Sequence, residues 1–224
     1  MRSLSTLILL VLYVVKPPIL SVHGPLPTGA PETNQIITGH LYTASINPET
    51  KVATWCAYVV TPGQFEGGNS IGRNWINARD GIEKICLEHQ DYSGSLYDMG
   101  HLVPLASFSS TRWAYECNFL GVIAPQTPNL NRGPWLRIEN LVRRLAKEHD
   151  KVRVCVGALY EKSMPKLAGA DEPHTVPSHY WALLRYDGVT LVYIIPQDCP
   201  QSIESLDQFA TTLEALKLRS KLGF

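Results

Sequence analysis

Apolar and polar residues alternate over several short stretches of the chain, and this pattern predicts β-strands. Residues 52–60 are rich in β-branched and aromatic side chains, and residues 152–156 place valines at every second position. Two further apolar and aromatic runs, 180–186 and 189–195, are joined by Asp187-Gly188, a pair that tolerates the positive φ angles of a type I′ turn. We therefore expect a sheet whose central strands include a hairpin near the C-terminal end.

Helical spacing of apolar residues occurs in two places. The first predicted helix opens at Pro134, because the first turn of a helix does not need the N–H that proline lacks. The second begins at Ser205, where Gln208 completes a capping box. Each helix has one apolar face, formed by Trp135, Ile138, Leu141, Val142 and Leu145 in the first and by Leu206, Phe209, Leu213 and Leu216 in the second. Strands and helices do not alternate regularly, which favours the α+β class with a mixed, largely antiparallel sheet.

The N-terminus has the pattern of a targeting segment. Arg2 is followed by an apolar run at 7–15 and then by a polar, proline-rich stretch. We expect a signal peptide or N-terminal anchor over 1–23, a Pro-rich linker over 24–34 and one domain over 35–224. The apolar run is short for a membrane span, so the mature chain should hold no stable span. Secretion is the first interpretation, an uncleaved anchor is the alternative, and mitochondrial import fits less well because the run is not amphipathic.

The charge balance is neutral overall and basic only locally. The chain has 20 Lys and Arg against 20 Asp and Glu, and removal of residues 1–23 would leave a formal charge of about −2, which excludes a broadly basic nucleic-acid binder. Residues 129–153 carry seven basic side chains against three acidic ones. A solvated helix face explains such a run as well as a nucleic-acid contact does.

Cysteine and histidine spacings do not indicate a zinc site. The five cysteines include no C-x-x-C pair, and Cys56, Cys117 and Cys155 lie in apolar runs where we expect buried thiols. Export would still permit a disulfide among the five. His174 and His179 lack a partner acid at zinc-site spacing, so we expect a loop histidine and a strand histidine.

Two segments could carry chemistry. Asp98-Met99-Gly100-His101 places an acid, a glycine and an imidazole in succession; histidine titrates near neutral pH, as a general base requires, and the glycine would let a substrate backbone approach. Asn131 precedes the predicted helix. Its side chain could cap that helix, or its amide oxygen could bind a hard cation such as Mg²⁺ that keeps most of its waters.

These segments together resemble the DNA/RNA non-specific endonucleases of the ββα-metal, or His-Me finger, fold, which include the Serratia-type secreted nuclease and endonuclease G. Residues 98–101 resemble the family's D-R-G-H motif, residues 125–131 its P-Q-x-x-x-L-N segment, and Trp135 with Glu139 its helical Trp and Glu. Residues 73–75, 157–160 and 174–178 contain further similar pieces, so the resemblance extends from about Gly39 to the C-terminus.

The resemblance implies a Mg²⁺-dependent, sugar-non-specific endonuclease that hydrolyses DNA and RNA to 5′-phosphate and 3′-hydroxyl ends. Mn²⁺ is the alternative cofactor, and a homodimer is left open. By this carry-over His101 is the base that deprotonates water, Asn131 the metal ligand and Glu139 the group that holds metal-bound waters. The positions implied to bind or act on the substrate phosphates are Arg73, Gln126, Arg137 and Arg143.

Two departures from the family pattern weaken this assignment. Met99 stands where the family has arginine, and Val122 stands where many members have asparagine. Loss of one charged hydrogen bond costs about 1.5–3 kcal/mol, whereas loss of a general base costs up to about 10⁴ in rate, so Met99 predicts a weaker enzyme. Arg112 and Arg137 are candidates to replace the missing charge. The alternative is a catalytically silent homologue that binds nucleic acid or protein.

Overall fold

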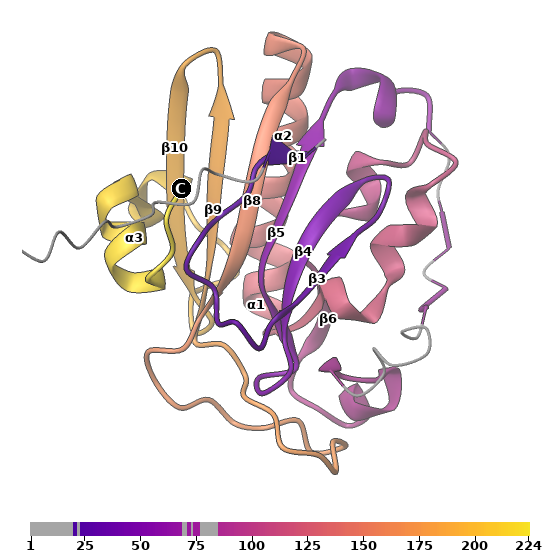
Figure 1. Ribbon diagram of the computed structural model, residues 1–224, viewed down its shortest axis with the longest axis vertical. Coiled ribbons are helices and arrows are strands. Elements are labelled where there is room, and N and C mark those ends of the chain that lie inside the picture. Colours follow the sequence, from indigo (N-terminus) through magenta and orange to yellow (C-terminus); the bar gives the residue numbers. More distant parts are fainter. Residues whose placement is uncertain (1–19, 22, 69–70, 73, 77–84) are drawn as a thin grey trace, which may run out of the picture.

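The computed structural model describes residues 20–21, 23–68, 71–72, 74–76 and 85–224. Its central element is a seven-stranded sheet in the order β11-β10-β9-β8-β5-β4-β3 (Figure 1), in which every neighbouring pair is antiparallel. The class is α+β, as predicted. The seven strands are β3 (Gln35–Thr38), β4 (Tyr42–Asn47), β5 (Val52–Val60), β8 (Val152–Leu159), β9 (His179–Tyr186), β10 (Val189–Pro196) and β11 (Ala210–Thr211).

The predicted strands and hairpin are confirmed. β5 and β8 cover the two valine-rich stretches, and β9 pairs with β10 from Tyr186–Val189 to His179–Pro196. The turn residues Asp187 and Gly188 have φ angles of 42° and 79°, which are the positive values of a type I′ turn.

The sheet is buried on both faces. Along β9, Tyr180, Ala182 and Leu184 join the larger hydrophobic cluster, while Trp181 and Leu183 join a smaller one on the other face. This is the two-residue period of a strand. Helix α2 (Leu136–His149) packs against the first face and α3 (Leu213–Ser220) contributes the fully buried Leu216 to the second.

A second, two-stranded sheet lies outside the large one. β6 (Asp98–His101) pairs antiparallel with β7 (Ile123–Gln126), so that Asp98 lies opposite Gln126 and His101 opposite Ile123. Helix α1 (Pro128–Leu130) follows β7 after one residue. Two strands and a helix thus bring the two chemically suggestive segments together.

The predicted start of the first helix, Pro134, is six residues too late. Helical structure begins at Pro128, where Thr127 Oγ1 accepts a hydrogen bond from the Leu130 N–H, and it continues through a π-helical turn (Asn131–Trp135) into α2. Gly133, with φ −114° and ψ −110°, interrupts the helical backbone just before Pro134. Pro134 therefore marks a kink within the helical run, and Thr127, not Asn131, is the residue that caps it.

The second predicted helix is broken. Leu206–Phe209 form a 3₁₀ turn that Ser205 caps, and Ala210–Thr211 then extend as β11 along β10. The true helix α3 begins after Thr212, whose hydroxyl accepts a hydrogen bond from Ala215 N–H. The chain pairs with the sheet edge here and does not continue as a helix, because an extended backbone at 210–211 provides hydrogen-bond partners for the backbone of β10.

Some described residues of the N-terminal stretch contact the domain. β1 (Leu20–Ser21) pairs with β2 (Gly24–Pro25), and Leu26, within the predicted linker, is buried in the smaller cluster beside Leu216. His23 is also buried and hydrogen-bonds through its ring to Thr43 and the His40 carbonyl. The predicted apolar leader at 7–15 lies outside the described residues. No helix in the described ranges is long and apolar enough to cross a membrane.

All five cysteines are buried free thiols, as predicted for Cys56, Cys117 and Cys155. Burial raises the pKa of Cys199 to about 11. The thiols are thus kept protonated, which makes them poor nucleophiles. His174 lies in a loop and His179 begins β9, also as predicted.

Candidate active site

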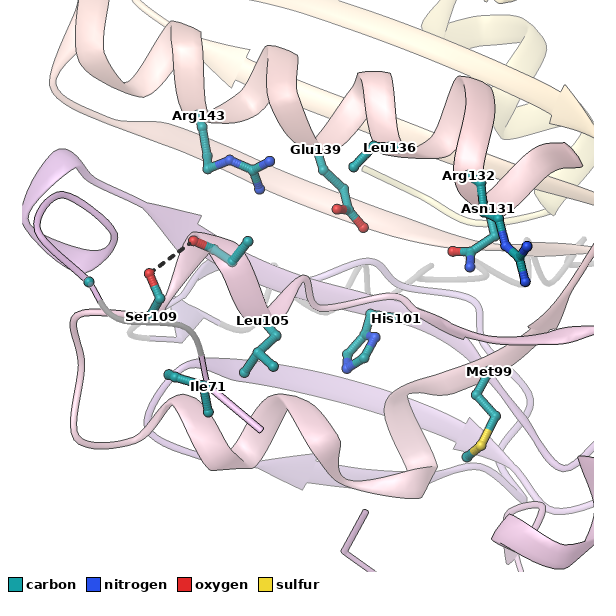
Figure 2. A pocket seen from close by; sticks show the side chains of 12 residues that line it. Ile71, Met99, His101, Leu105, Ser109, Asn131, Arg132, Leu136, Glu139 and Arg143 are labelled. Atoms are coloured by element: carbon teal, nitrogen blue, oxygen red, sulfur yellow. Dashed lines mark hydrogen bonds between the residues drawn. The ribbon is translucent and has the colours of Figure 1, made fainter. Parts of the chain in front are cut away.

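A cavity of about 560 Å³ opens between β6, the helical run and the loop that follows β6. Figure 2 shows Met99 and His101 on one side of it and Glu139 and Arg143 on the other. The residues that line it are Gly68, Ile71, Met99, His101, Leu105, Ala106, Ser109, Asn131, Arg132, Leu136, Glu139 and Arg143.

Secondary-structure periodicity explains which side chains reach the cavity. Met99 and His101 are two residues apart on β6 and therefore share a face. Leu136, Glu139 and Arg143 are spaced at i, i+3 and i+7 on α2 and form one helical stripe. Asn131 and Arg132 join them from the π-helical turn before the kink.

His101 is held from two directions and is 8% exposed. The indole N–H of Trp135 donates to the His101 carbonyl oxygen at 3.0 Å, which fixes the strand against the helical run. The imidazole Nε2 lies 3.1 Å from Oδ1 of Asn118, and the Trp75 ring lies 5.5 Å from the imidazole ring.

Asn118 defines the tautomer of His101. Its Nδ2 donates to the Gly72 carbonyl oxygen at 3.2 Å, and a carbonyl can only accept. Its Oδ1 must therefore face His101, where it accepts the hydrogen bond from Nε2–H. The neutral imidazole then carries its lone pair on Nδ1, so Nδ1 is the nitrogen that can accept a proton.

Asp98 orients Asn131 in a similar way. Nδ2 of Asn131 donates to a carboxylate oxygen of Asp98 at 2.9 Å. Since an ionised carboxylate only accepts, the amide must present its NH₂ to Asp98, which leaves its Oδ1 directed away from that carboxylate. Asn131 lines the cavity, and Figure 2 shows its side chain reaching toward the strand that carries Met99.

Arg132 grips the same carboxylate with two hydrogen bonds. Its Nε and Nη2 donate to the two Asp98 oxygens at 2.8 and 2.7 Å. These hydrogen bonds raise the pKa of the Arg132 guanidinium above its ordinary value. The side chain stays charged, is 62% exposed and lines the cavity together with Met99.

Arg143 lies at the opposite end of the helical stripe. Its Nη1 donates to the buried Ser107 hydroxyl at 3.2 Å, and its Nη2 donates to Asn140 Oδ1 at 2.6 Å. Arg143 is half-buried and lines the cavity. A positively charged arginine side chain, Arg132 or Arg143, therefore lies on each side of Glu139 along the helical segment.

Four predicted residues thus meet in one cavity: His101, Asn131, Glu139 and Arg143. Arg137 does not join them, because it lies about 100° around the helix from Leu136 and its Nη1 donates to the Glu204 carbonyl at 3.5 Å. Gln126 is fully buried and absent from the lining. Arg73 lies outside the described residues.

The two departures from the family pattern differ in position. Met99 is half-buried and lines the cavity, whereas Val122 is fully buried in the hydrophobic core. Only the methionine therefore changes the character of the cavity wall. Close packing gives a second explanation for the glycine at position 100, besides the expected approach of a substrate. A Cβ there would lie 2.2 Å from Oε1 of Gln126.

Sequence reasoning missed Asn118 and Arg132. Asn118 lies 17 residues from His101, and no short spacing signals that contact. Arg132 follows Asn131 directly, yet a helix predicted from Pro134 leaves it in a loop with no defined direction. The true start at Pro128 puts it on the first turns beside Asp98.

The donors in the cavity are hard oxygens. Within the described ranges, no group of three or more His, Cys, Asp or Glu side chains could hold a metal ion. The Asn131 amide oxygen and the Glu139 carboxylate are of the type that Mg²⁺ prefers, and Mg²⁺ usually retains several waters. The donor set therefore fits a hard divalent cation and does not fit zinc, which prefers Cys and His.

Comparison with known proteins bears on this site. The profile of DNA/RNA non-specific endonucleases matches residues 25–217. A protein named "Nuclease" from Serratia marcescens is 33% identical over 212 residues, a match that covers 88% of this chain and 76% of the relative. "Endonuclease G, mitochondrial" from Homo sapiens is 26% identical over 211 residues and is covered to 71% of its length.

The fold agrees with these matches. A chain in the crystal structure titled "Crystal structure of the EndoG/EndoGI complex: Mechanism of EndoG inhibition" superposes with a TM-score of 0.75 at 21% identity, over 88% of this chain and 87% of that chain. Since the profile match spans nearly the whole described domain and includes every described residue of the cavity, the chain belongs to the DNA/RNA non-specific endonuclease family.

Proposed function

We propose that this chain is a divalent-metal-dependent endonuclease that hydrolyses phosphodiester bonds in both DNA and RNA, leaving 5′-phosphate and 3′-hydroxyl ends. The observation that carries the proposal is the meeting of His101, Asn131 and Glu139 in one cavity, from a strand, a π-helical turn and a helix. Family membership supports the class of reaction, because nucleases are phosphodiester hydrolases.

Asn131 and Glu139 would hold the cation. Asp98 accepts from the Asn131 NH₂, so the amide oxygen is the atom available to a metal, and Glu139 offers carboxylate oxygens to water around it. Mg²⁺ is the proposed ion, with Mn²⁺ as the alternative. When bound, the cation supplies positive charge that stabilises the charge on the phosphate and on the leaving oxygen.

His101 would be the general base. With Nε2–H held by Asn118, Nδ1 takes a proton from the water that attacks the phosphorus. The bond between phosphorus and the 3′-oxygen breaks, and that oxygen leaves and is protonated to the 3′-hydroxyl. A base of this kind contributes about 10²–10⁴ in rate. Burial of the imidazole against Trp75 and the Trp135 contact to its backbone limit its rotation, which keeps the ring in position for each turnover.

Phosphate recognition would depend on charge and not on bases. Arg143 is fixed by Ser107 and Asn140 and still lines the cavity, so its remaining N–H groups can bind a phosphate oxygen. Phosphate contacts carry no base information. We therefore propose low sequence preference and activity on both sugars.

The silent-homologue alternative rests on Met99 and Val122, of which only Met99 lines the cavity. A protein that only binds nucleic acid needs basic side chains, but it does not need an oriented histidine beside an oriented amide. Catalysis therefore explains better why Asn118 orients His101 and Asp98 orients Asn131 through hydrogen bonds. Cleavage experiments decide between the two functions.

The test incubates the purified chain with supercoiled plasmid DNA or a long RNA in millimolar Mg²⁺ or Mn²⁺, with and without a chelator. Nicking of the plasmid and fragmentation of the RNA are measured. We expect cutting that the chelator stops, and its loss in a His101→Ala variant that still folds and whose free energy of unfolding falls by no more than the about 1–3 kcal/mol that an unsatisfied buried partner costs. His149→Ala is the matched control, because His149 lies at the far end of α2 beside Asp187. Cutting that persists in the chelator, or no cutting with either ion, would refute the proposal.

We further propose secretion, which rests on the apolar run at 7–15. Anchoring at the N-terminus is the alternative, and relatives named mitochondrial make import a third outcome to test. Expression of the whole chain with a C-terminal tag, followed by fractionation and N-terminal sequencing of the product, distinguishes the three.

A further inference from the structure

At one position of the cavity wall, the family pattern has a positively charged arginine and this chain does not. Residue 99 of the D-R-G-H-like segment is methionine, and its thioether lines the cavity two residues before His101. A thioether is only a weak hydrogen-bond acceptor and offers no donor to a phosphate. Any charged contact to phosphate on this side of the cavity must come from another residue.

Arg132 is placed to make that contact. It lines the same cavity as Met99, and Figure 2 shows its guanidinium extending from the helical run toward the strand that carries Met99. Neither sequence candidate competes with it. The Arg112 guanidinium lies 4.6 Å above the Trp113 ring, outside the lining, and Arg137 is bound to the Glu204 carbonyl.

The hydrogen bonds of Arg132 leave part of its guanidinium available. Nε and Nη2 donate to Asp98, which uses two of the five N–H groups that arginine carries. The remaining N–H groups can donate to a phosphate, while the two bonds to Asp98 hold the planar group in one orientation. Arginine serves this double task better than lysine because its fork has a fixed geometry.

The Asp98–Arg132 pair is only partly buried. The Arg132 side chain is 62% exposed and the Asp98 side chain is 18% exposed, so solvent screens the pair and limits its contribution to folding. The chain holds a comparable pair elsewhere: Nε and Nη2 of Arg219 donate to the two oxygens of Glu161, each at 2.7 Å. That pair involves α3, which packs on the opposite face of the sheet.

We infer that Arg132 makes the charged contact to a substrate phosphate that an arginine at position 99 would otherwise make. The positively charged side chain then comes from the helical segment and not from β6. The inference rests on the proposed nuclease function for its substrate, a nucleic-acid phosphate. It also makes Asp98 a shared support, since one carboxylate orients both Asn131 and Arg132.

Binding tests the inference without cleavage. The whole chain is titrated into a fluorescently labelled 20-nucleotide DNA strand in chelator, and anisotropy is measured at several salt concentrations. We expect Arg132→Gln to weaken binding about three- to tenfold and to reduce the salt slope by about one counterion. Arg219→Gln, the matched control, should change neither. An Arg132→Gln variant that binds like the parent overturns the inference.

A charge swap separates phosphate contact from support of Asp98. Met99→Arg added to Arg132→Gln returns a cation to the cavity but not the two bonds to Asp98. We expect it to recover most of the lost affinity and, in Mg²⁺, most of a ten- to hundredfold loss in kcat/KM. A folded double variant that recovers neither overturns the inference. A parent chain that binds through Arg132 but never cuts would instead refute the nuclease proposal alone.

Discussion

Asn118 connects His101 to the loop that precedes Trp75: its Oδ1 accepts from His101 Nε2 at 3.1 Å, and its Nδ2 donates to the Gly72 carbonyl at 3.2 Å. The amide is 1% exposed. Because both of its polar atoms are engaged, Asn118 can neither flip nor rotate without losing a buried hydrogen bond. The orientation of the proposed base therefore depends on a residue that would not touch the substrate.

Asn118→Ala should lower kcat about ten- to hundredfold while KM changes little, because the imidazole loses its orientation and the phosphate contacts remain. Stability should fall by about 1–3 kcal/mol, the cost of leaving buried partners unsatisfied. Steady-state cleavage kinetics and chemical denaturation measure the two effects.

The control for that variant is Asn34→Ala. Asn34 also donates twice, to Ser45 Oγ at 2.9 Å and to Thr54 Oγ1 at 2.8 Å, but it lies in the loop just before β3 and does not line the cavity. It should cost stability without lowering kcat. Equal kcat losses in both variants would mean that reduced stability, and not the His101 orientation, explains the effect.

Asp98→Ala should raise the Mg²⁺ concentration needed for half-maximal cutting about tenfold or more. The Asn131 amide then loses the acceptor that directs its oxygen, and outer partners of metal ligands typically contribute 10–100-fold in metal affinity. A Mg²⁺ titration of initial rates measures the shift. Arg132→Gln, which keeps Asp98, should shift this concentration much less, and an unchanged midpoint in Asp98→Ala would contradict the orienting role.

Local patterns were sufficient for four central strands of the large sheet, but not for its outer strands β3, β4 and β11 or for the cavity. The strands β5, β8, β9 and β10 were predictable because each repeats apolar residues with a strand period or ends in a turn pair with positive φ. β6 and β7 were not, because Asp98–His101 is short and polar and β7 contains Pro125, a residue that usually lies outside sheet interiors.

Helix boundaries depended on contacts between distant segments. Pro128 and Pro134 are both acceptable first-turn residues, and the sequence alone does not choose between them. The structure adds that Gly133 is closely packed: a Cβ there would lie 2.4 Å from the Gln201 carbonyl oxygen. His101, Asn131, Glu139 and Arg143, which the family resemblance singled out, line one cavity, and their catalytic roles stay predictions, whereas the position of Arg132 depends on the kinked turn.

Acidification should destabilise the domain through His179. Burial lowers the pKa of this imidazole below 6.5, and the nearby Glu161 only partly opposes the effect. The folded state therefore binds the proton less readily than the unfolded chain, so the free energy of unfolding is fully retained above pH 6.5 and falls as the pH drops below it. Denaturant titrations between pH 7.5 and 5 follow this loss.

The matched variant for that measurement is His179→Gln, which keeps a polar side chain beside Ser178 and Glu161 but does not titrate. Its stability should depend less on pH over the same interval. Arg219 lowers the pKa of the Glu161 carboxylate, but this acts at more acidic pH. An identical pH dependence in parent and variant would assign the loss to another group.

Gly100→Ala should destabilise the chain by about 1–3 kcal/mol, the usual cost of overpacking. The new Cβ would lie 2.2 Å from Oε1 and 2.4 Å from Cδ of Gln126, so this fully buried side chain would have to shift. The double variant Gly100→Ala/Gln126→Ala removes the obstructing amide and should recover part of the loss. Gln126→Ala alone should leave KM unchanged, because Gln126 does not line the cavity. A raised KM in that single variant would restore the substrate-binding role that the family resemblance implies for Gln126, whereas additive losses in the double variant would show that the two side chains do not compete for one space.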